Sequence, residues 1–182
     1  MADTLTVAKF EFGMQFTLGN DDASAPVSTG PVSYAAKFPM TDGVGENQAD
    51  KIYWSKGRSL AGGASEELDL AGVLTDALVA VLTFVELVGI VVRVTAVNGA
   101  GVHVGGSSSN GFANWISSAG TFGTDQPKIT VKGGPSGGLF VLVCTKAAGY
   151  GVTAGTADKL KIANDDGALA VTYDVGLIGR SA

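Results

Sequence analysis

The stretch KLKIANDDGALAVTYDVGL, residues 159 to 177, decides the fold class of this chain. Leucine and isoleucine alternate with lysine at its start, and apolar side chains return at every second position from Leu169 to Leu177. A period of two places these side chains on one face of an extended strand. Between the two runs, Asn164 to Gly167 contains an Asp-Gly pair, which supplies the positive φ of a tight turn. The pattern predicts an antiparallel hairpin that ends the chain.

Other parts of the chain show the same alternation. From residue 82 to 94 apolar side chains share one face, but Glu86 breaks the pattern and Gly89 follows it. We therefore expect a bend or bulge that divides this stretch into two strands. Leu139 to Cys144 is apolar on both faces, which is typical of a central strand between two layers. Further alternating apolar positions are Phe10, Phe12, Met14, Phe16, Leu18, Leu68 and Leu70.

Glycine fills 27 of the 182 positions, about twice the usual share of about 7%. Because these glycines follow no Gly-X-Y period, they indicate many tight turns and not collagen. The nearest candidate for a helix is Leu74 to Leu82, whose valines and threonine argue against one. We expect an all-β fold of about ten short strands, an antiparallel, jelly-roll-like β-sandwich with Gly-rich turns and little helix, with a small barrel as the alternative.

The length and two polar segments suggest how the chain is divided. A chain of 182 residues is enough for one core, or for one domain with an arm. The polar loop 19–31 sets off an N-terminal strand section or docking arm, residues 1–40, from a β-sandwich domain, residues 41–182. A second long loop, residues 105–127, is rich in Gly, Ser and Asn. Loops of this length inside compact domains are usually functional or mobile.

Charge and hydropathy exclude two classes of partner. Twelve basic and 17 acidic residues give a net charge of −5, and the bases are scattered, so nucleic acid is not expected as a partner. The apolar segment from Val73 to Val92 is interrupted by Asp76 and Glu86 and is not expected to span a membrane. The charged fraction of 16% is below the usual value of about 25%, which favours a protein that hides surface against copies of itself or neighbours.

The chain has few residues suited to catalysis or metal binding. It contains one histidine, His103, and one cysteine, Cys144. Ser107 to Ser109 and Asp125 supply the other residue types of a catalytic triad, but their spacing matches no known signature. One histidine and one cysteine cannot make a usual zinc site, and we interpret Cys144 as a small core residue. The run from Gly133 to Gly138 lacks the Lys-Ser/Thr ending of a phosphate loop and precedes a strand, so it is read as a turn. We therefore expect no enzyme, no cofactor and no metal.

The aromatic residues are the best candidates for contacts with partners. Tyr53 and Trp54 are adjacent in a predicted strand, so one should point inward and the other should be more exposed. For Trp115, in the long loop, three roles stay open: an anchor for the core or loop, a subunit contact, and a platform for a sugar. The candidate interface residues are Phe10, Phe12, Phe16, Phe112, Trp115 and Phe122.

Three segments resemble a known class of protein. They are DGVGENQADKIYW from Asp42, SEELDLAGVLTD from Ser65 and TAGTADKLKIAN from Thr153. Over residues 41 to 179 they are similar to small β-rich virion proteins of tailed bacteriophages. The resemblance implies a capsid decoration or cement protein, assembled in the host cytoplasm, with the major capsid protein, other virion proteins and copies of itself as partners. A tail or head-fibre component and a carbohydrate-binding β-sandwich module are the alternatives. No catalytic residue carries over.

Overall fold

The computed structural model describes residues 8–16, 32–76, 79–107, 109–116 and 127–182. Within these ranges the chain forms strands and turns and no helix, and all pairings between strands are antiparallel. The predicted all-β, antiparallel fold is therefore confirmed, and the described sheets do not close into a barrel.

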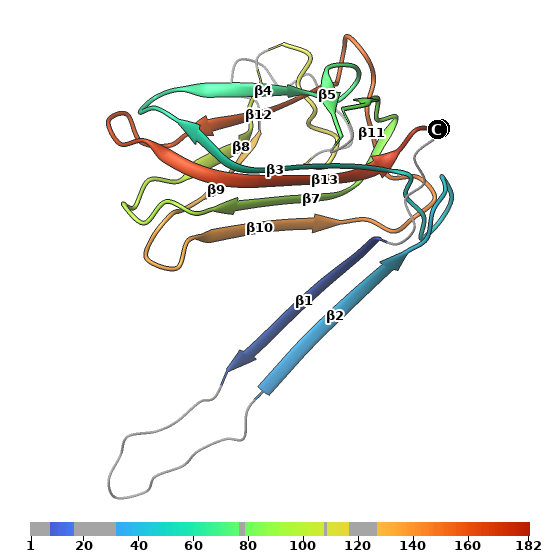
Figure 1. Ribbon diagram of the computed structural model, residues 1–182, viewed down its shortest axis with the longest axis horizontal. Helices are drawn as coiled ribbons and strands as arrows, with labels where there is room; N and C mark the ends of the chain where they lie inside the picture. Colours follow the sequence, from blue (N-terminus) through green and yellow to red (C-terminus); the bar gives the residue numbers. More distant parts are fainter. Residues whose placement is uncertain (1–7, 17–31, 77–78, 108, 117–126) are drawn as a thin grey trace, which may run out of the picture.

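Two larger sheets are stacked to form the body (Figure 1). The five-stranded sheet has the order β10-β7-β13-β3, with β11 beside β7, and the four-stranded sheet has the order β4-β12-β8-β9. The first consists of β3 (Lys51–Leu60), β7 (Glu86–Val94), β10 (Gly138–Val143), β11 (Tyr150–Gly151) and β13 (Val171–Arg180). The second consists of β4 (Ser65–Asp69), β8 (Val102–Gly105), β9 (Lys128–Val131) and β12 (Lys159–Asn164).

Apolar side chains from both sheets meet in one core. Fully buried members include Ile90, Val92, Val175 and Leu177 from the five-stranded sheet. The facing sheet contributes Leu68, Val102, Val104, Leu160 and Ile162. An ion pair between Arg58 of β3 and Glu66 of β4 also joins the sheets. Strand β5 (Leu74–Thr75) pairs with β6 (Val81–Leu82) beside this core.

The predicted C-terminal hairpin is wrong, although both of its strands exist. Strand β12 pairs with β4 and β8, whereas β13 pairs with β3 and β7, so the turn at 164–167 crosses from one sheet to the other. The buried Asn164 side chain holds this corner by donating to the carbonyls of Leu60, Ala61 and Leu169. Gly167 is not among the residues with positive φ. Alternation determines which face of a strand is buried, but it does not determine which strand pairs with it.

The irregularity predicted near Gly89 is present. Strand β6 ends at Leu82 and β7 begins at Glu86, so the apolar stretch is divided in two, but the division lies before Glu86 and β7 continues through Gly89. In addition, the register between β13 and β7 shifts between Ile178 and Gly179, which pair with Gly89 and Leu87. One residue of β7 is therefore unpaired at this point, as in a β-bulge.

Two predictions about glycine-rich and apolar segments have different outcomes. The segment 133–137 is the turn before β10, as predicted, and a Cβ on Gly133 would lie 2.0 Å from the Ala100 carbonyl oxygen. By contrast, Leu139 to Cys144 is not a central strand. It forms β10, at one end of the five-stranded sheet, and Cys144 beyond it is half-buried.

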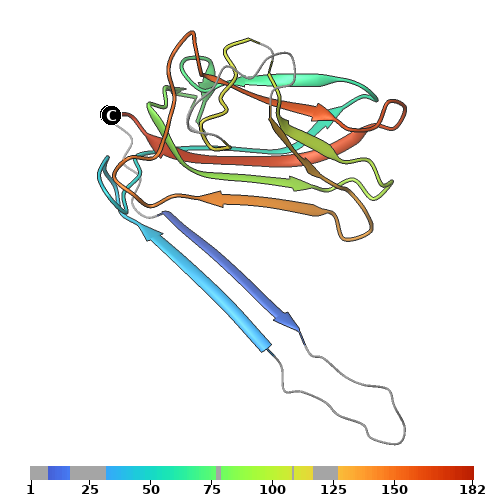
Figure 2. The same cartoon turned by 180° about the vertical axis from the view of Figure 1, so that it is seen from behind.

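The N-terminal strands form a separate hairpin. Strand β1 (Ala8–Phe16) pairs with β2 (Val32–Met40) and with no other described strand. We call this hairpin the arm, residues 8–16 and 32–40. Figures 1 and 2 show that it leaves the body below β10 and points away from it. The division at residue 40 into an arm and a domain stays a prediction.

Tyr173 provides a test of the core. Its side chain is fully buried, and its hydroxyl has no hydrogen-bond partner among the described residues. An unpaired buried hydroxyl costs about 1–3 kcal/mol, so Tyr173→Phe should leave the free energy of unfolding unchanged or raise it by about 1 kcal/mol in urea denaturation. Tyr53→Phe is the matched control, because its hydroxyl accepts from Arg58 Nη1 at 3.1 Å, and it should lower stability. A marked loss in Tyr173→Phe would contradict this assignment.

Asp165 makes the corner sensitive to pH. Burial raises the pKa of its carboxyl, but the hydrogen bonds from Lys132 Nζ (2.5 Å) and the Gly101 amide (2.6 Å) outweigh burial and hold the pKa below its usual value. A lowered pKa stabilises the fold above about pH 4, and this contribution is lost as the pH falls through the folded-state pKa. Asp165→Asn should therefore cost about 1.5 kcal/mol at pH 7, and less at pH 3, in urea titrations.

Asp42→Asn, at an exposed position, is the control for Asp165→Asn. It should have little effect at either pH. An equal loss for Asp165→Asn at pH 7 and pH 3 would show that the charge of Asp165 is not the cause.

Candidate interaction surface

The outer face of the four-stranded sheet is polar. Glu67 lies opposite Lys161 and also binds Lys159, with 3.2 Å between Glu67 Oε2 and Lys159 Nζ. A hydrogen bond from Ser107 lowers the pKa of Glu67, and Lys159 acts in the same direction against the opposing effect of burial. Such a face is typical of an antiparallel sheet with one side in water.

The five-stranded sheet differs, because much of its side away from the core is apolar as well. Away from the core, one row of paired residues across four strands reads Val141, Val91, Gly176 and Trp54. The neighbouring row reads Val143, Gly89, Ile178 and Ile52. We call these eight residues, together with Leu139, the outer face; the row of Leu139 continues with the charged residues Arg93 and Asp174, which border it.

Several outer-face side chains are exposed in the isolated chain. Trp54 is 50% exposed and Leu139 is 54% exposed. Sheets that are apolar on both sides are normally covered on both, and contiguous exposed apolar patches mark interaction sites. This explains why β10 has an apolar sequence on both faces although it is an edge strand: a second layer is expected on its outer side.

Trp54 lies flat against the sheet. A Cβ on Gly176 would come within 2.3 Å of the indole ring, so glycine is required for this close approach. The Lys56 ammonium lies over the ring, 5.8 Å from its centroid. Tyr53 is buried in the core. The prediction that one of the two adjacent aromatic residues points inward and the other is more exposed is therefore confirmed.

The arm has one apolar side near the outer face. Phe12, Tyr34 and Phe38 are exposed by 42%, 57% and 36%. Glu11 and Lys37, opposite each other in the register, form an ion pair with 3.2 Å between Oε1 and Nζ. Phe10 and Phe16 lie in β1, but their side chains are outside the described part of the structure.

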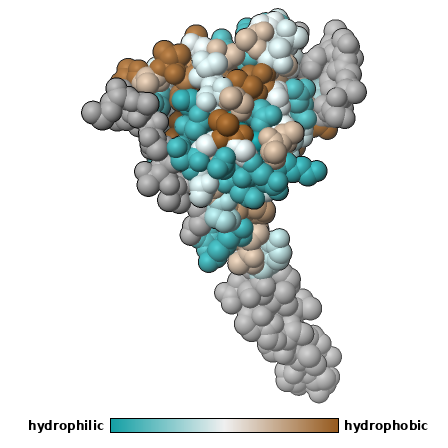
Figure 3. Space-filling view, turned by 90° about the vertical axis from the view of Figure 1, so that its right-hand side faces the viewer, coloured by the Kyte–Doolittle hydropathy of each residue, from teal (hydrophilic) through white to brown (hydrophobic). Residues whose placement is uncertain are grey.

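The arm and the outer face enclose a wedge-shaped groove. Its volume is about 400 Å³, and both of its walls are apolar. In Figure 3 the coloured part of the arm lies directly below the body. The residues that line the groove are Phe12, Tyr34, Ala36, Phe38, Leu139, Val141 and Val143.

The base of the arm is fixed to the body. Met40, the last residue of β2, is buried in a small cluster with Ala49, Val88 and Ile178. The backbone then turns back through a bridge between Thr41 and Gln48. These contacts set the direction in which β2 leaves the body.

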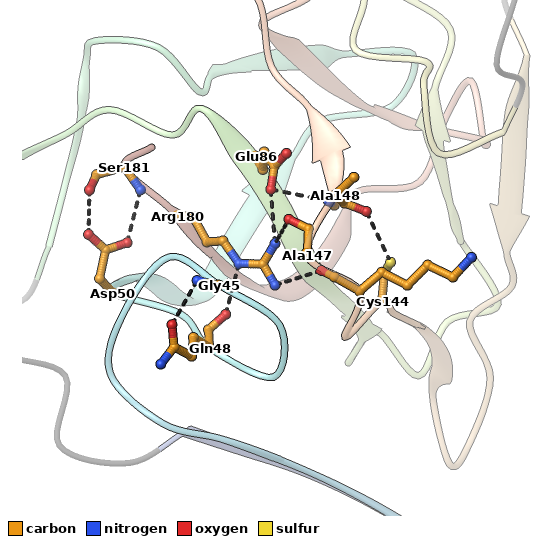
Figure 4. A network of polar contacts seen from close by, with 11 residues as sticks. Gly45, Gln48, Asp50, Glu86, Cys144, Ala147, Ala148, Arg180 and Ser181 are labelled. Atoms are coloured by element: carbon orange, nitrogen blue, oxygen red, sulfur yellow. Dashed lines mark hydrogen bonds and ion pairs between the residues drawn. The ribbon is translucent and has the colours of Figure 1, made fainter.

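Arg180 joins this turn to two other segments (Figure 4). Its side chain is fully buried, and Nε donates to the Gln48 carbonyl at 2.9 Å. Nη1 donates to Glu86 Oε2 at 2.9 Å, and both Nη1 and Nη2 donate to carbonyls of the 146–147 turn. One guanidinium therefore holds the turn at the base of the arm, the start of β7 and the loop after β10.

The residues considered for catalysis are not brought together. His103 Nδ1 lies 2.9 Å from Thr130 Oγ1, and burial lowers the pKa of the imidazole. Ser107 donates instead to Glu67 Oε1 at 2.8 Å, and Asp125 is outside the described residues. Across the described ranges no group of three or more His, Cys, Asp or Glu side chains is placed to hold a metal. Nor does this part of the chain contain a helix that could cross a membrane.

Two of the predicted interface residues belong to the core. Phe112 is 2% exposed and Trp115 is 8% exposed. The Trp115 indole donates to the Phe112 carbonyl and packs against Phe140, with ring centroids 5.4 Å apart. This is the anchoring role left open for Trp115, and the prediction of a contact surface at Phe112 and Trp115 is corrected accordingly. Phe122 lies outside the described residues.

Phe112 and Trp115 are not available to a partner, because the long loop enters the core at these two residues. Apart from Trp54, the residues that sequence reasoning missed are those of the outer face and of β2. Two signals could have found them: the doubly apolar run Leu139–Cys144, and the alternation of Tyr34, Ala36, Phe38 and Met40.

Comparisons with known proteins do not assign the chain to a family. Neither protein-family models, nor curated proteins, nor solved structures give a match to this chain. The resemblance to phage virion proteins therefore stays a prediction.

Arg180→Met tests how the surface is held. Removing one partner of a buried ion pair costs about 3–5 kcal/mol, and here three carbonyl oxygens also lose their donor. We expect a loss of that size in the free energy of unfolding, measured by urea denaturation. Arg93→Met, at an exposed position in β7, should change stability by less than about 0.5 kcal/mol. Equal effects of the two substitutions would contradict the role given to Arg180.

Proposed function

We propose that this chain is a non-enzymatic structural protein of a tailed-phage virion, a capsid decoration protein that attaches through buried surface. We assign its two stacked sheets to the β-sandwich class, of jelly-roll type. One observation carries the proposal. The five-stranded sheet has a second apolar face, and an arm with an apolar side projects next to it.

The arrangement suits attachment better than chemistry. Apolar surface of this extent favours a macromolecular partner, and the described residues that line the groove form no charged or metal-binding cluster that would orient a small substrate. The polar face of the other sheet would remain in water. A protein that covers a particle needs such a division between an adhesive side and a solvated side.

Trp54 gives specific support to one alternative, a carbohydrate-binding module. A half-exposed indole lying flat on a sheet is the kind of aromatic platform on which a sugar ring stacks. Against this, the Lys56 ammonium already lies over the ring. Glycan binding by the purified monomer, lost in Trp54→Ala, would favour the alternative.

The proposal predicts that the chain is found on particles. Phage particles purified by density gradient from an infected culture should contain this chain in many copies, as quantified by mass spectrometry. Val141→Asp places a charge on the outer face where it lines the groove and should strongly reduce the number of copies per particle, because the charge would be buried without a partner.

Thr130→Asp introduces the same side chain on the polar face of the other sheet and is the matched control. It should leave the copy number unchanged. If the chain stays in the soluble fraction and is absent from particles, it is not a virion protein.

A further inference from the structure

We propose that the outer face is covered by a second copy of this chain, whose arm packs on it while the arms are exchanged reciprocally. This deepens the proposed function, on which it rests, by naming a second copy of the chain, on the particle as in solution, as the partner that buries the outer face. An isolated two-stranded hairpin is at best marginally stable in water and needs a further layer on its apolar side. Phe12, Tyr34 and Phe38 remain exposed in a single chain, so that layer is incomplete.

The chain's own outer face does not complete the layer. Closing the wedge would require β2 to leave the body in a different direction. That would pull Met40, which is 2% exposed, out of its contacts with Val88 and Ile178. It would also disturb the turn that Arg180 holds through the Gln48 carbonyl. The arm is thus kept at an angle to its own sheet, and both walls of the groove stay open.

A second copy of the chain would cover both walls of the groove, the arm and the outer face. Each chain carries an apolar arm and an apolar outer face. In a two-fold contact the arm of each chain packs on the outer face of the other chain. A hairpin of two strands fits on the four longer strands of the five-stranded sheet, because neighbouring strands are about 4.8 Å apart and stacked sheets lie about 10 Å apart. A different protein would have to provide one apolar surface for the arm and another for the outer face.

The exposed area agrees with a dimer contact. Aromatic side chains bury about 150–250 Å² each. The exposed fractions of Phe12, Tyr34, Phe38 and Trp54 therefore offer about 350 Å² per chain. Ile52, Leu139 and Val141 are also partly exposed and extend this area toward the about 800 Å² per partner of a standard interface.

Cysteine cross-linking tests the exchange in the full chain. In a Cys144→Ser background, one chain carries Tyr34→Cys and another carries Leu139→Cys. Both positions are exposed and line the groove. When the two chains are mixed and oxidised, a disulfide between position 34 of one and position 139 of the other should give a linked dimer, identified by mass spectrometry. The yield should exceed that of either chain alone.

Light scattering and sedimentation measure the same contact without cysteines. The wild-type chain should be dimeric at about 100 µM, well above a Kd of about 1 µM. Val141→Asp should weaken the dimer at least tenfold, and Thr130→Asp should not. Leu139→Lys, at a more exposed position, repeats the test if Val141→Asp fails to fold by circular dichroism.

Three results would overturn the exchange. The first is a wild-type chain that is monomeric at that concentration. The second is a dimer that Val141→Asp and Leu139→Lys leave intact. The third is a Tyr34→Cys/Leu139→Cys double variant that links only within one chain. These results are separate from the test on particles: a monomer that still binds particles overturns the exchange alone, and a dimer that is absent from particles overturns the virion function alone.

Discussion

The guanidinium of Arg180 is fully buried, and four hydrogen bonds make that burial possible. Its acceptors come from the turn at Gln48, from Glu86 at the start of β7, and from the loop after β10. Taking a charge out of water is expensive unless its donors are satisfied. The three segments must therefore keep their positions together, and the direction of the arm follows from them.

The same constraint determines what the two sides of the body present. Next to the Arg180 site, Met40 packs on Ile178 at one end of the outer face, and beyond this point the arm and the sheet separate. The result is an apolar groove open to a partner on one side of the molecule. On the other side, the Glu67, Lys159 and Lys161 charges lie on a face that suits water. Assembly through one side and solvation of the other follow from this asymmetry.

The candidate surface could be predicted only in part. Alternation from Phe10 to Phe16 pointed to an apolar strand near the N-terminus, and Phe12 does line the groove. The doubly apolar run from Leu139 to Cys144 contained the other half of the surface, but a run of this kind is equally typical of a central strand. Phe112 and Trp115 were expected to meet a partner because they lie in a Gly-rich loop, and they are instead core residues.

By itself the sequence determined the all-β class, the inward side of β4, β7, β12 and β13, and the break near Glu86. Only the tertiary structure decided that β12 and β13 belong to opposite sheets, that β10 is an edge strand, and that β1 pairs with β2. The physical reason is that side-chain periodicity is a local property, set by the two-residue repeat of an extended backbone. The choice of neighbouring strand depends on contacts between residues far apart in the chain, such as Arg180 with Gln48. A local sequence pattern does not predict such contacts.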